Sequence, residues 1–165
     1  MKIQLNPIKG DFLEGTTSLL LLPIAVSRFN AHIDQLHPML TFVKNFCLQE
    51  NIDSDKIYDI LISVEEAVVN IIQYGFPQKE RGSIEITCQK DQNKMLILDI
   101  KDSGIPFDPL LRINEYKKSG QPFKKDLEPG GSGIFLYGTL IDIIEYQRKD
   151  ETNHLHFVKY LKIVG

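Results

Sequence analysis

Two residues whose side chains could do chemistry, Glu66 and Asn70, stand four positions apart in the sequence. Apolar residues around them recur at helical spacing from Ile57 to Ile72, and positions i and i+4 of a helix share one face. A carboxylate and an amide oxygen one turn apart could hold a hard cation and orient a nucleophile. Taken alone, the pair fits an ordinary solvent-exposed helix face better.

The surroundings of this pair favour a functional interpretation. Asn is a mediocre helix former and an odd choice in the middle of a helix for solvation alone. The segment also runs straight into Gly75 and Pro77 and then into predicted strands, which places the face near a cleft. We expect this face to lie opposite the apolar stripe and to carry three further polar residues, Asp59, Ser63 and Gln73.

A second polar cluster, from Asp102 to Asp108, directly follows a predicted strand. It contains Gly104, Pro106 and Phe107. Asp, Gly and Pro are the usual turn residues, so a plain turn is the simplest interpretation of this cluster.

A third cluster is the glycine-rich segment Gly130–Gly133, which includes Ser132 and precedes a helix predicted to begin at Ile134. Glycines permit close backbone approach, and N–H groups at a helix start attract anions. The segment therefore fits a phosphate site about as well as a flexible loop end. It is not a Walker P-loop, because no Gly-Lys-Ser/Thr follows, and it lacks the G-x-G-x-x-G spacing of a dinucleotide site.

The elements that must position these clusters can be read from the apolar pattern. Helices are predicted from Ile33 to Cys47, from Ile57 to Ile72 and from Ile134 to Ile141. The Asp53–Asp55 cluster is expected to supply capping oxygens for the second helix. The polar segment from Lys101 to Gly131 is rich in Gly and Pro and is predicted to be a long, irregular binding loop.

Strands alternate with these helices, and residues 1–15 are expected to form an edge strand or a loose arm. Runs of strands with helices between them predict an α+β fold, a two-layer sandwich with helices on one face of a mostly antiparallel sheet. No linker divides the chain, so residues 1–165 are expected to form a single domain. The predicted strands are Ser18–Ile24, Ile84–Cys88, Met95–Ile100, Ile143–Gln147 and Leu155–Ile163, with a hairpin turn at Asp91–Asn93.

The composition is that of an ordinary globular domain. The chain has 165 residues, of which 42% are hydrophobic, and 19 Lys and Arg against 22 Asp and Glu give a net charge of −3. Nucleic acids and anionic membranes both select basic proteins, so neither is an expected partner. The longest apolar run, Leu19–Val26, is too short to span a membrane, and we expect a cytoplasmic protein.

Cysteines and histidines give weaker signals. Cys47 and Cys88 lack the spacing of a zinc site, and two buried thiols are expected rather than a disulfide. His154 and His156 alternate on a predicted strand and could share a metal ion, but the sequence shows no third ligand beside them.

In their order and spacing, the three clusters resemble the N, G1 and G2 boxes of the GHKL superfamily of ATP-binding domains, which have the Bergerat fold. Residues next to the boxes look like those of the anti-sigma-factor serine/threonine kinases of bacterial partner-switching systems. The resemblance runs from about Ser18 to Ile163. The matching positions are Glu66 and Asn70 for the N box, Asp102, Gly104, Pro106 and Phe107 for G1, and Gly130, Gly131, Ser132, Gly133 and Ile134 for G2.

The resemblance implies a role for each box. Glu66 would act as the general base toward a serine hydroxyl, and Asn70 would ligate the Mg²⁺ that bridges the phosphates of ATP. Asp102 would hydrogen-bond the adenine amino group, with Gly104 leaving room for the ring. The glycines of the third box would let backbone N–H groups reach the phosphates, and residues 110–129 would form a lid over the nucleotide.

The resemblance also implies a biological role. The protein would be an ATP-binding anti-sigma factor and a homodimer, which phosphorylates an anti-anti-sigma (STAS-like) partner and sequesters a sigma factor. The alternative is a nucleotide-gated binding module without significant phosphotransfer. Tyr74 and Pro129 favour this alternative, because many relatives place His near the first position and some place Arg near the second. A sensor histidine kinase is disfavoured, since no His lies on a dimerising helical hairpin.

Overall fold

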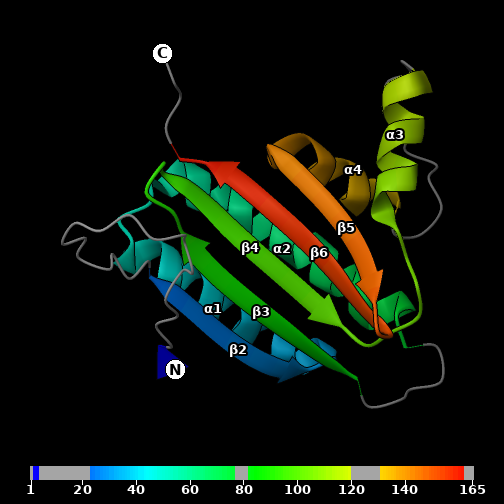
Figure 1. Ribbon diagram of the computed structural model, residues 1–165, viewed down its shortest axis with the longest axis horizontal. Helices are drawn as coiled ribbons and strands as arrows, with labels where there is room; N and C mark the ends of the chain where they lie inside the picture. Colours follow the sequence, from blue (N-terminus) through cyan, green and yellow to red (C-terminus); the bar gives the residue numbers. More distant parts are fainter. Residues whose placement is uncertain (1, 4–22, 77–81, 120–130, 162–165) are drawn as a thin grey trace, which may run out of the picture.

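The computed structural model describes residues 2–3, 23–76, 82–119 and 131–161. Within these residues a single sheet of six strands crosses the molecule in the order β1-β2-β3-β4-β6-β5, and neighbouring strands run antiparallel (Figure 1). The strands are β1 (Lys2–Ile3), β2 (Ile24–Asn30), β3 (Ser83–Lys90), β4 (Met95–Asp102), β5 (Ile143–Lys149) and β6 (Thr152–Tyr160).

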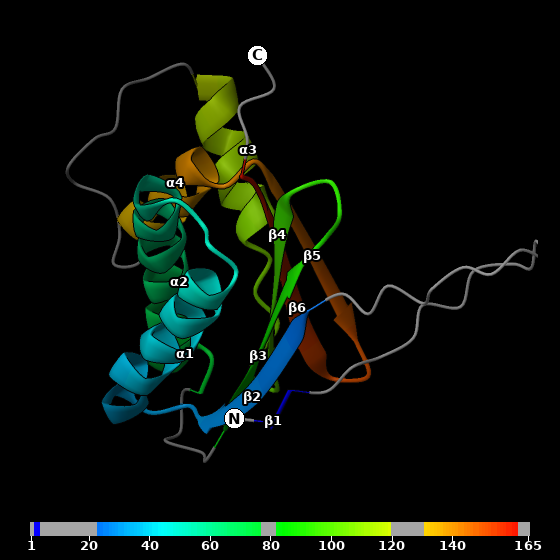
Figure 2. The same ribbon diagram turned by 90° about the vertical axis from the view of Figure 1, so that its left-hand side faces the viewer.

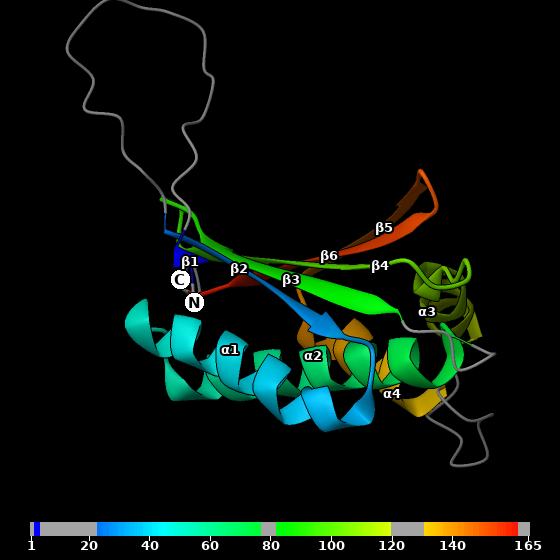
Figure 3. The same ribbon diagram turned by 90° about the horizontal axis from the view of Figure 1, so that it is seen from below.

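The helices form a second layer on one face of the sheet. Figure 3 shows α1, α2 and α4 below the sheet, and Figure 2 shows α3 beside the end of this layer, next to β5. The other face of the sheet carries no helix of the described chain. This arrangement confirms the predicted two-layer α+β sandwich. The helices are α1 (Leu36–Gln49), preceded by the 3₁₀ turn η1 (Ile33–Gln35), α2 (Ser54–Tyr74), α3 (Pro109–Ser119) and α4 (Gly131–Leu140).

The hydrophobic core fills the space between the two layers. Strands β3 and β4 alternate buried and partly exposed residues, as expected for a sheet with one covered face. Helix α2 presents Ile60, Val64 and Val68, each with no exposed surface, to this core. The apolar pattern therefore predicted these elements correctly, including the end of α2 next to Gly75.

The first strand of the core was predicted less well. Residues 18–22 of the predicted strand lie outside the described part of the chain, and only Ile24 belongs to β2, which continues to Asn30. The sequence IAVSRFN of β2 lacks a clean alternation, which is why its apolar residues did not mark it. Of the predicted arm or edge strand 1–15, Lys2 and Ile3 pair with Val26 and Ala25 at the edge.

The sequence predicts the position of the start of α2 correctly, but it does not predict correctly how the start is capped. Asp53 occupies the N-cap position with an extended backbone, as the sequence predicts, but its side chain accepts no capping hydrogen bond. Its backbone carbonyl accepts the first helical bond from Ile57 N at 3.0 Å. The stability of this end of the helix therefore depends on the packing of Ile57, which is 8% exposed, rather than on a side-chain cap.

The prediction of an irregular loop from Lys101 to Gly131 is wrong over Pro109–Ser119, which form α3; residues 103–108 do form a loop, and residues 120–130 lie outside the described part of the chain. Asp108 caps this helix by accepting a hydrogen bond from Leu110 N at 2.9 Å, and Pro109 stands at its first position, where a missing N–H costs nothing. Ile113 packs closely against Gly138 of α4. An Asp-Pro pair before two well-spaced apolar residues was a readable helix start within a polar segment.

A buried lysine joins three elements on the helical side of the sheet. Lys159 of β6 is 6% exposed and pairs with Asp59 of α2 at 3.0 Å. Its ammonium group also donates to the carbonyl of Leu140, the last residue of α4. Asp59, which the sequence placed on the functional face of α2, therefore has a structural partner.

The two cysteines are free and buried, as expected. Burial raises the pKa of the Cys47 thiol to about 12 and holds that of Cys88 well above its usual range. Both are thus unreactive thiols at neutral pH. Within the described residues, no helix is long and apolar enough to cross a membrane.

Candidate functional site

The face of α2 that carries Glu66 and Asn70 is turned toward the protein, not toward solvent. Ser63 has no exposed surface and Asn70 only 9%, while Glu66 is partly buried. Helix α4 packs along α2 on this side. The expectation that this face lies opposite the buried surface is therefore wrong for Ser63, Glu66 and Asn70, which form a second buried surface beside α4. It holds for Gln73, which is exposed.

Glu66 meets the glycine segment at the start of α4. A Cβ atom added to Gly133 would lie 2.1 Å from Glu66 Oε2 and 3.2 Å from its Cβ, so the backbone of Gly133 lies directly against the carboxyl group. The structure thus brings the first and third sequence clusters into contact. A larger residue here would displace the carboxyl group of Glu66, so glycine is what lets the two lie in contact.

The environment of Glu66 favours its protonated form. Partial burial raises the pKa of its carboxyl group, and the negative charge of the neighbouring Glu65 raises it further. A carboxylate with a raised pKa is a stronger base than an exposed glutamate. Glu66 also contributes to the raised pKa of Tyr137, a buried residue of α4, although desolvation of the phenol is the larger cause.

Asn70, one turn further along α2, has an unsatisfied donor. Among the residues that the structure describes, no atom accepts a hydrogen bond from its buried Nδ2. A buried polar group without a partner costs free energy and is uncommon in native proteins. The amide is therefore available to a group that the described residues do not supply.

The second cluster is fixed by Asp102, the last residue of β4. Asp102 is 5% exposed, and its Oδ1 accepts hydrogen bonds from Gly104 N at 2.8 Å and from Asn153 Nδ2 at 2.9 Å. Burial raises the pKa of this carboxyl group, although the two hydrogen bonds and the charge of Arg148 oppose the shift. In the described chain, no hydrogen bond involves Oδ2, which leaves one acceptor oxygen free.

Asn153 of β6 holds the turn after β4 in place. Its Nδ2 also donates to the carbonyl of Ile105 at 2.9 Å, and its Oδ1 accepts from Tyr146 Oη at 2.8 Å and from Arg148 at 2.7 Å. Arg148 donates in addition to the carbonyl of Gly104 at 2.9 Å. This network fixes the orientation of Asp102 from the side of the hairpin formed by β5 and β6.

Gly104 allows the turn to approach the end of α2. A Cβ atom at this position would lie 2.7 Å from the carbonyl oxygen of Gly75 and 2.8 Å from Asp102 Oδ1. Ile105 N donates to the same Gly75 carbonyl at 2.9 Å. The close approach joins the second cluster to the helix that carries the first one.

A small hollow of about 70 Å³ lies between α2, this turn, α4 and β6. Such a volume holds several water molecules. Asn70 and Asp102 both border it, so the structure brings these two predicted residues to one site. Its walls are mostly apolar and include Ile71, Tyr74, Ile105, Phe107, Tyr137, Tyr146 and Leu155, with Asn153 as a further polar group.

The other residues predicted for the site lie at the border of the hollow, away from it, or at the start of α4. Phe107 borders the hollow and is 40% exposed, whereas Pro106 is exposed and does not border it. Gly131, Ser132 and Gly133 form the first turn of α4, so this helix begins three residues before the predicted start at Ile134, which is buried. First-turn N–H groups have no partner within the helix. Gly130, like residues 120–129 of the predicted lid, lies outside the described residues.

Sequence reasoning missed Asn153, Tyr146 and Arg148. All three stand on the hairpin formed by β5 and β6, far in sequence from Asp102, and their types are ordinary for strands. One signal was available: Asn is depleted in strands, so its presence near the start of an apolar strand called for an explanation.

Replacing Asn153 by alanine is expected to lower the free energy of unfolding by roughly 2–4 kcal/mol, because several buried polar groups would lose their partner. Chemical denaturation of the variant measures this loss. Asn93→Ala is the matched control, since Asn93 is exposed and makes a single bond to Asp91. Equal stability of the two variants would show that the network does not hold the turn.

Comparisons with known proteins show what the chain is similar to. The sequence model of the histidine kinase-like ATPase domain family matches residues 29–159. An anti-sigma F factor from Clostridium botulinum is 30% identical over 149 residues, covering 89% of this chain and 90% of that protein. The serine/threonine-protein kinase BtrW from Bordetella bronchiseptica is 24% identical over 119 residues, covering 70% and 79% respectively.

A solved structure shares the fold. The RsbU and RsbW domains of a Mycobacterium tuberculosis protein superpose with a TM-score of 0.62 at 13% identity, over 86% of this chain. The chain spans 33% of that larger structure. The match supports the two-layer fold described above.

Proposed function

The chain belongs to the family of histidine kinase-like ATPase domains, and we propose that it is an anti-sigma factor with serine/threonine kinase activity. It would use ATP with Mg²⁺ to phosphorylate a serine of a STAS-like anti-anti-sigma partner in the cytoplasm. Relatives named anti-sigma F factor and serine/threonine-protein kinase support this role.

One observation carries the proposal: the carboxyl group of Glu66 lies against Gly133 in the first turn of α4. A helix start of this kind offers unpaired N–H groups to anions such as phosphates. A base placed beside a phosphate site is the arrangement that phosphoryl transfer to a hydroxyl requires.

Binding of the adenine base is assigned to the hollow beside Asp102. The free oxygen Oδ2 can accept a hydrogen bond from the 6-amino group, while Oδ1 is held by Gly104 and Asn153. The apolar walls suit a flat ring, and Tyr74 and Phe107 are both partly exposed at the border. The phosphates would extend along α2 toward Asn70 and Gly133.

The residues present fit a magnesium ion at Asn70. The nitrogen and oxygen of an Asn amide are interchangeable by a half-turn of the group, so the side chain that leaves Nδ2 unpaired can equally present an oxygen to a hard cation. Bound there, Mg²⁺ would neutralise phosphate charge. Buried and preformed, Asn70 is held ready for this contact by the packing of α2 against α4.

In the transfer step, the serine oxygen forms a bond to the γ-phosphorus as the bond from that phosphorus to the β-bridging oxygen breaks. ADP leaves, and the serine proton passes to Glu66. Partial burial beside Glu65 raises the pKa of Glu66, which makes it a better proton acceptor near neutral pH. The protein otherwise contributes position and charge, which dominate catalysis of this reaction.

A second candidate function is a nucleotide-gated binding module that transfers no phosphate. Tyr74, which borders the hollow with 41% of its surface exposed, favours it. Where many relatives place a His shortly after the N-box Asn, this chain has Tyr74, whose side chain cannot supply a positive charge to a phosphate.

Incubation with γ-labelled ATP, Mg²⁺ and a STAS-domain protein from the same genome separates the two functions. We expect label on a serine of that partner, together with capture of a sigma factor by a homodimer of this chain. Tight ATP binding by calorimetry without transfer to any STAS partner would select the binding module. Neither function involves nucleic acid or a membrane.

A further inference from the structure

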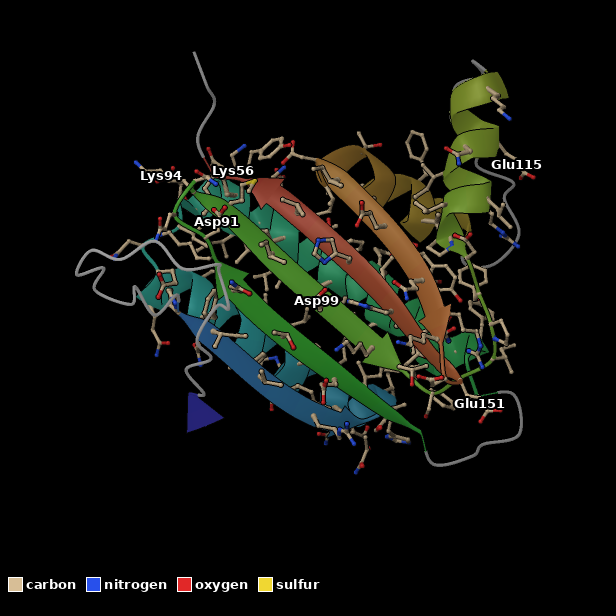
Figure 4. All side chains as sticks on the ribbon, in the orientation of Figure 1. Lys56, Asp91, Lys94, Asp99, Glu115 and Glu151 are labelled. Atoms are coloured by element: carbon tan, nitrogen blue, oxygen red, sulfur yellow. The ribbon has the colours of Figure 1, made fainter. Side chains whose placement is uncertain are left out.

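A cluster of metal-ligand side chains lies on the open face of the sheet, away from the hollow described above. His154 Nε2 lies 2.6 Å from Asp99 Oδ1, and His156 Nδ1 lies 2.7 Å from the same oxygen. Figure 4 shows Asp99 near the middle of the face that no described helix covers. Asp99 is three positions before Asp102 on β4, so the two carboxylates point to opposite faces of the sheet.

The register of the sheet produces this cluster. Asp99 of β4 stands directly opposite His156 of β6, and His154 follows on the same face two residues away. The planes of the two imidazole rings are at 89° to each other, with centroids 6.2 Å apart, and one nitrogen of each ring points to Asp99. The third ligand that the sequence did not show is therefore supplied by a neighbouring strand.

The spacing of the three donor atoms fits one ion. They lie within 4.8 Å of one another. Around a tetrahedral Zn²⁺ with bonds of about 2.0–2.1 Å, donor atoms are about 3.3 Å apart. Each nitrogen would therefore have to move about half an ångström to an ångström away from the carboxylate oxygen, which small side-chain rotations provide.

The surroundings leave room for the ion and a fourth ligand. The side chains of the three residues are each 22–33% exposed, so the donor set is accessible. Both histidines border a hollow of about 430 Å³ next to β5. Glu145 of β5 also borders it and stands opposite His156, which places a second carboxylate beside the cluster. Lys101 of β4 stands opposite His154 and reduces the net negative charge of the cluster.

We propose that Asp99, His154 and His156 form a binding site for a divalent transition-type cation, best fitted by Zn²⁺. Two imidazoles and one carboxylate are a common donor set for such ions, and imidazole selects them over Mg²⁺ and Ca²⁺. The site is separate from the nucleotide site, so the proposal is independent of kinase activity.

The proposal is tested by calorimetric titration of the full chain with Zn²⁺, in the absence of an affinity tag and of nucleotide. We expect one ion per chain, and loss of binding by at least about 100-fold in His156→Ala, since even outer-shell changes at metal sites cost 10–100-fold. Co²⁺ should give the intense visible absorption of a tetrahedral complex in the wild type and not in His156→Ala.

His32→Ala is the matched control, because His32 also contacts a carboxylate, that of Asp34, at 3.2 Å on the surface. It should bind Zn²⁺ like the wild type. If His156→Ala is poorly folded, Asp99→Asn preserves the size of the side chain and should lose binding equally. Wild-type affinity in Asp99→Asn, or an equal loss in His32→Ala, would overturn the proposal.

Discussion

Replacing Glu66 by glutamine is expected to reduce phosphate transfer to a STAS partner by about 10²–10⁴-fold, while ATP binding changes little. The amide has the shape of the carboxyl group and fits against Gly133, but it cannot accept the serine proton. Single-turnover transfer from labelled ATP measures the first effect, and calorimetry with ATP and Mg²⁺ measures the second.

Glu65→Gln is the control for this experiment. Glu65 is the neighbouring carboxylate and is exposed, whereas Glu66 is partly buried against α4. Its substitution removes a charge that raises the pKa of Glu66, and transfer should stay within a few-fold of the wild type. Undiminished transfer by Glu66→Gln would remove Glu66 from the mechanism.

The raised pKa of Glu66 predicts how both the transfer rate and the stability change with pH. The rate of transfer should fall on acidification at a higher pH than the ordinary pKa of glutamate, because the base is lost when it binds a proton. A carboxyl group whose pKa is higher in the folded state stabilises the fold when protonated, and this contribution is lost as the pH rises through the folded-state pKa. Glu66→Gln should therefore raise the thermal midpoint at pH 7.

Replacing Asp102 by asparagine is expected to weaken ATP binding by roughly 10²-fold, the cost of losing a hydrogen bond to a charged acceptor. The amide oxygen can still accept from Gly104 and Asn153 in place of Oδ1. The amide nitrogen then faces the adenine amino group, and two donors oppose each other. Because burial raises the pKa of Asp102, losing the charge should not unfold the protein.

Inosine triphosphate makes this prediction specific. Its base carries an oxygen in place of the 6-amino group. Inosine triphosphate should therefore bind the wild type more weakly than ATP does, and it should bind Asp102→Asn more tightly than ATP does. Asp142→Asn, a neutralised surface carboxylate on the turn after α4, should leave both affinities unchanged. Retention of the wild-type preference for ATP by Asp102→Asn would mean that the base binds elsewhere.

The sequence carried enough information for the layers and for the three clusters. The stripe on α2 and the alternation on β3 and β4 follow from burial against one partner layer, which leaves a periodic trace. Helix α3 leaves a shorter apolar trace, because of its residues with described side chains only Pro109 and Ile113 are buried. The second buried face of α2 also escaped prediction, since it buries the polar residues Ser63 and Asn70 and meets α4 through Gly133 at Glu66.

Long-range contacts account for what sequence reasoning could not find. Asn153 meets Asp102 across 51 residues, and Asp99 meets His154 across 55. Neither contact leaves a pattern in the local sequence. Both depend on the pairing of β6 with β4 and on the register of that pairing. A role for Asp102 in nucleotide binding is predicted only by resemblance, and the partners that hold its side chain were found only through the structure.

The buried contact of Lys159 holds one end of α4 more firmly than the other. At its C-terminal end, the carbonyl of Leu140 accepts a hydrogen bond from Lys159, which also pairs with Asp59 of α2. Its N-terminal end is the glycine turn beside Glu66. Breaking a buried ion pair costs about 3–5 kcal/mol, so a pivot about Leu140 is the cheaper displacement. We expect any tilt of α4 about this end to be largest near Gly133, roughly 10 Å away along the helix, where it would change the distance to Glu66.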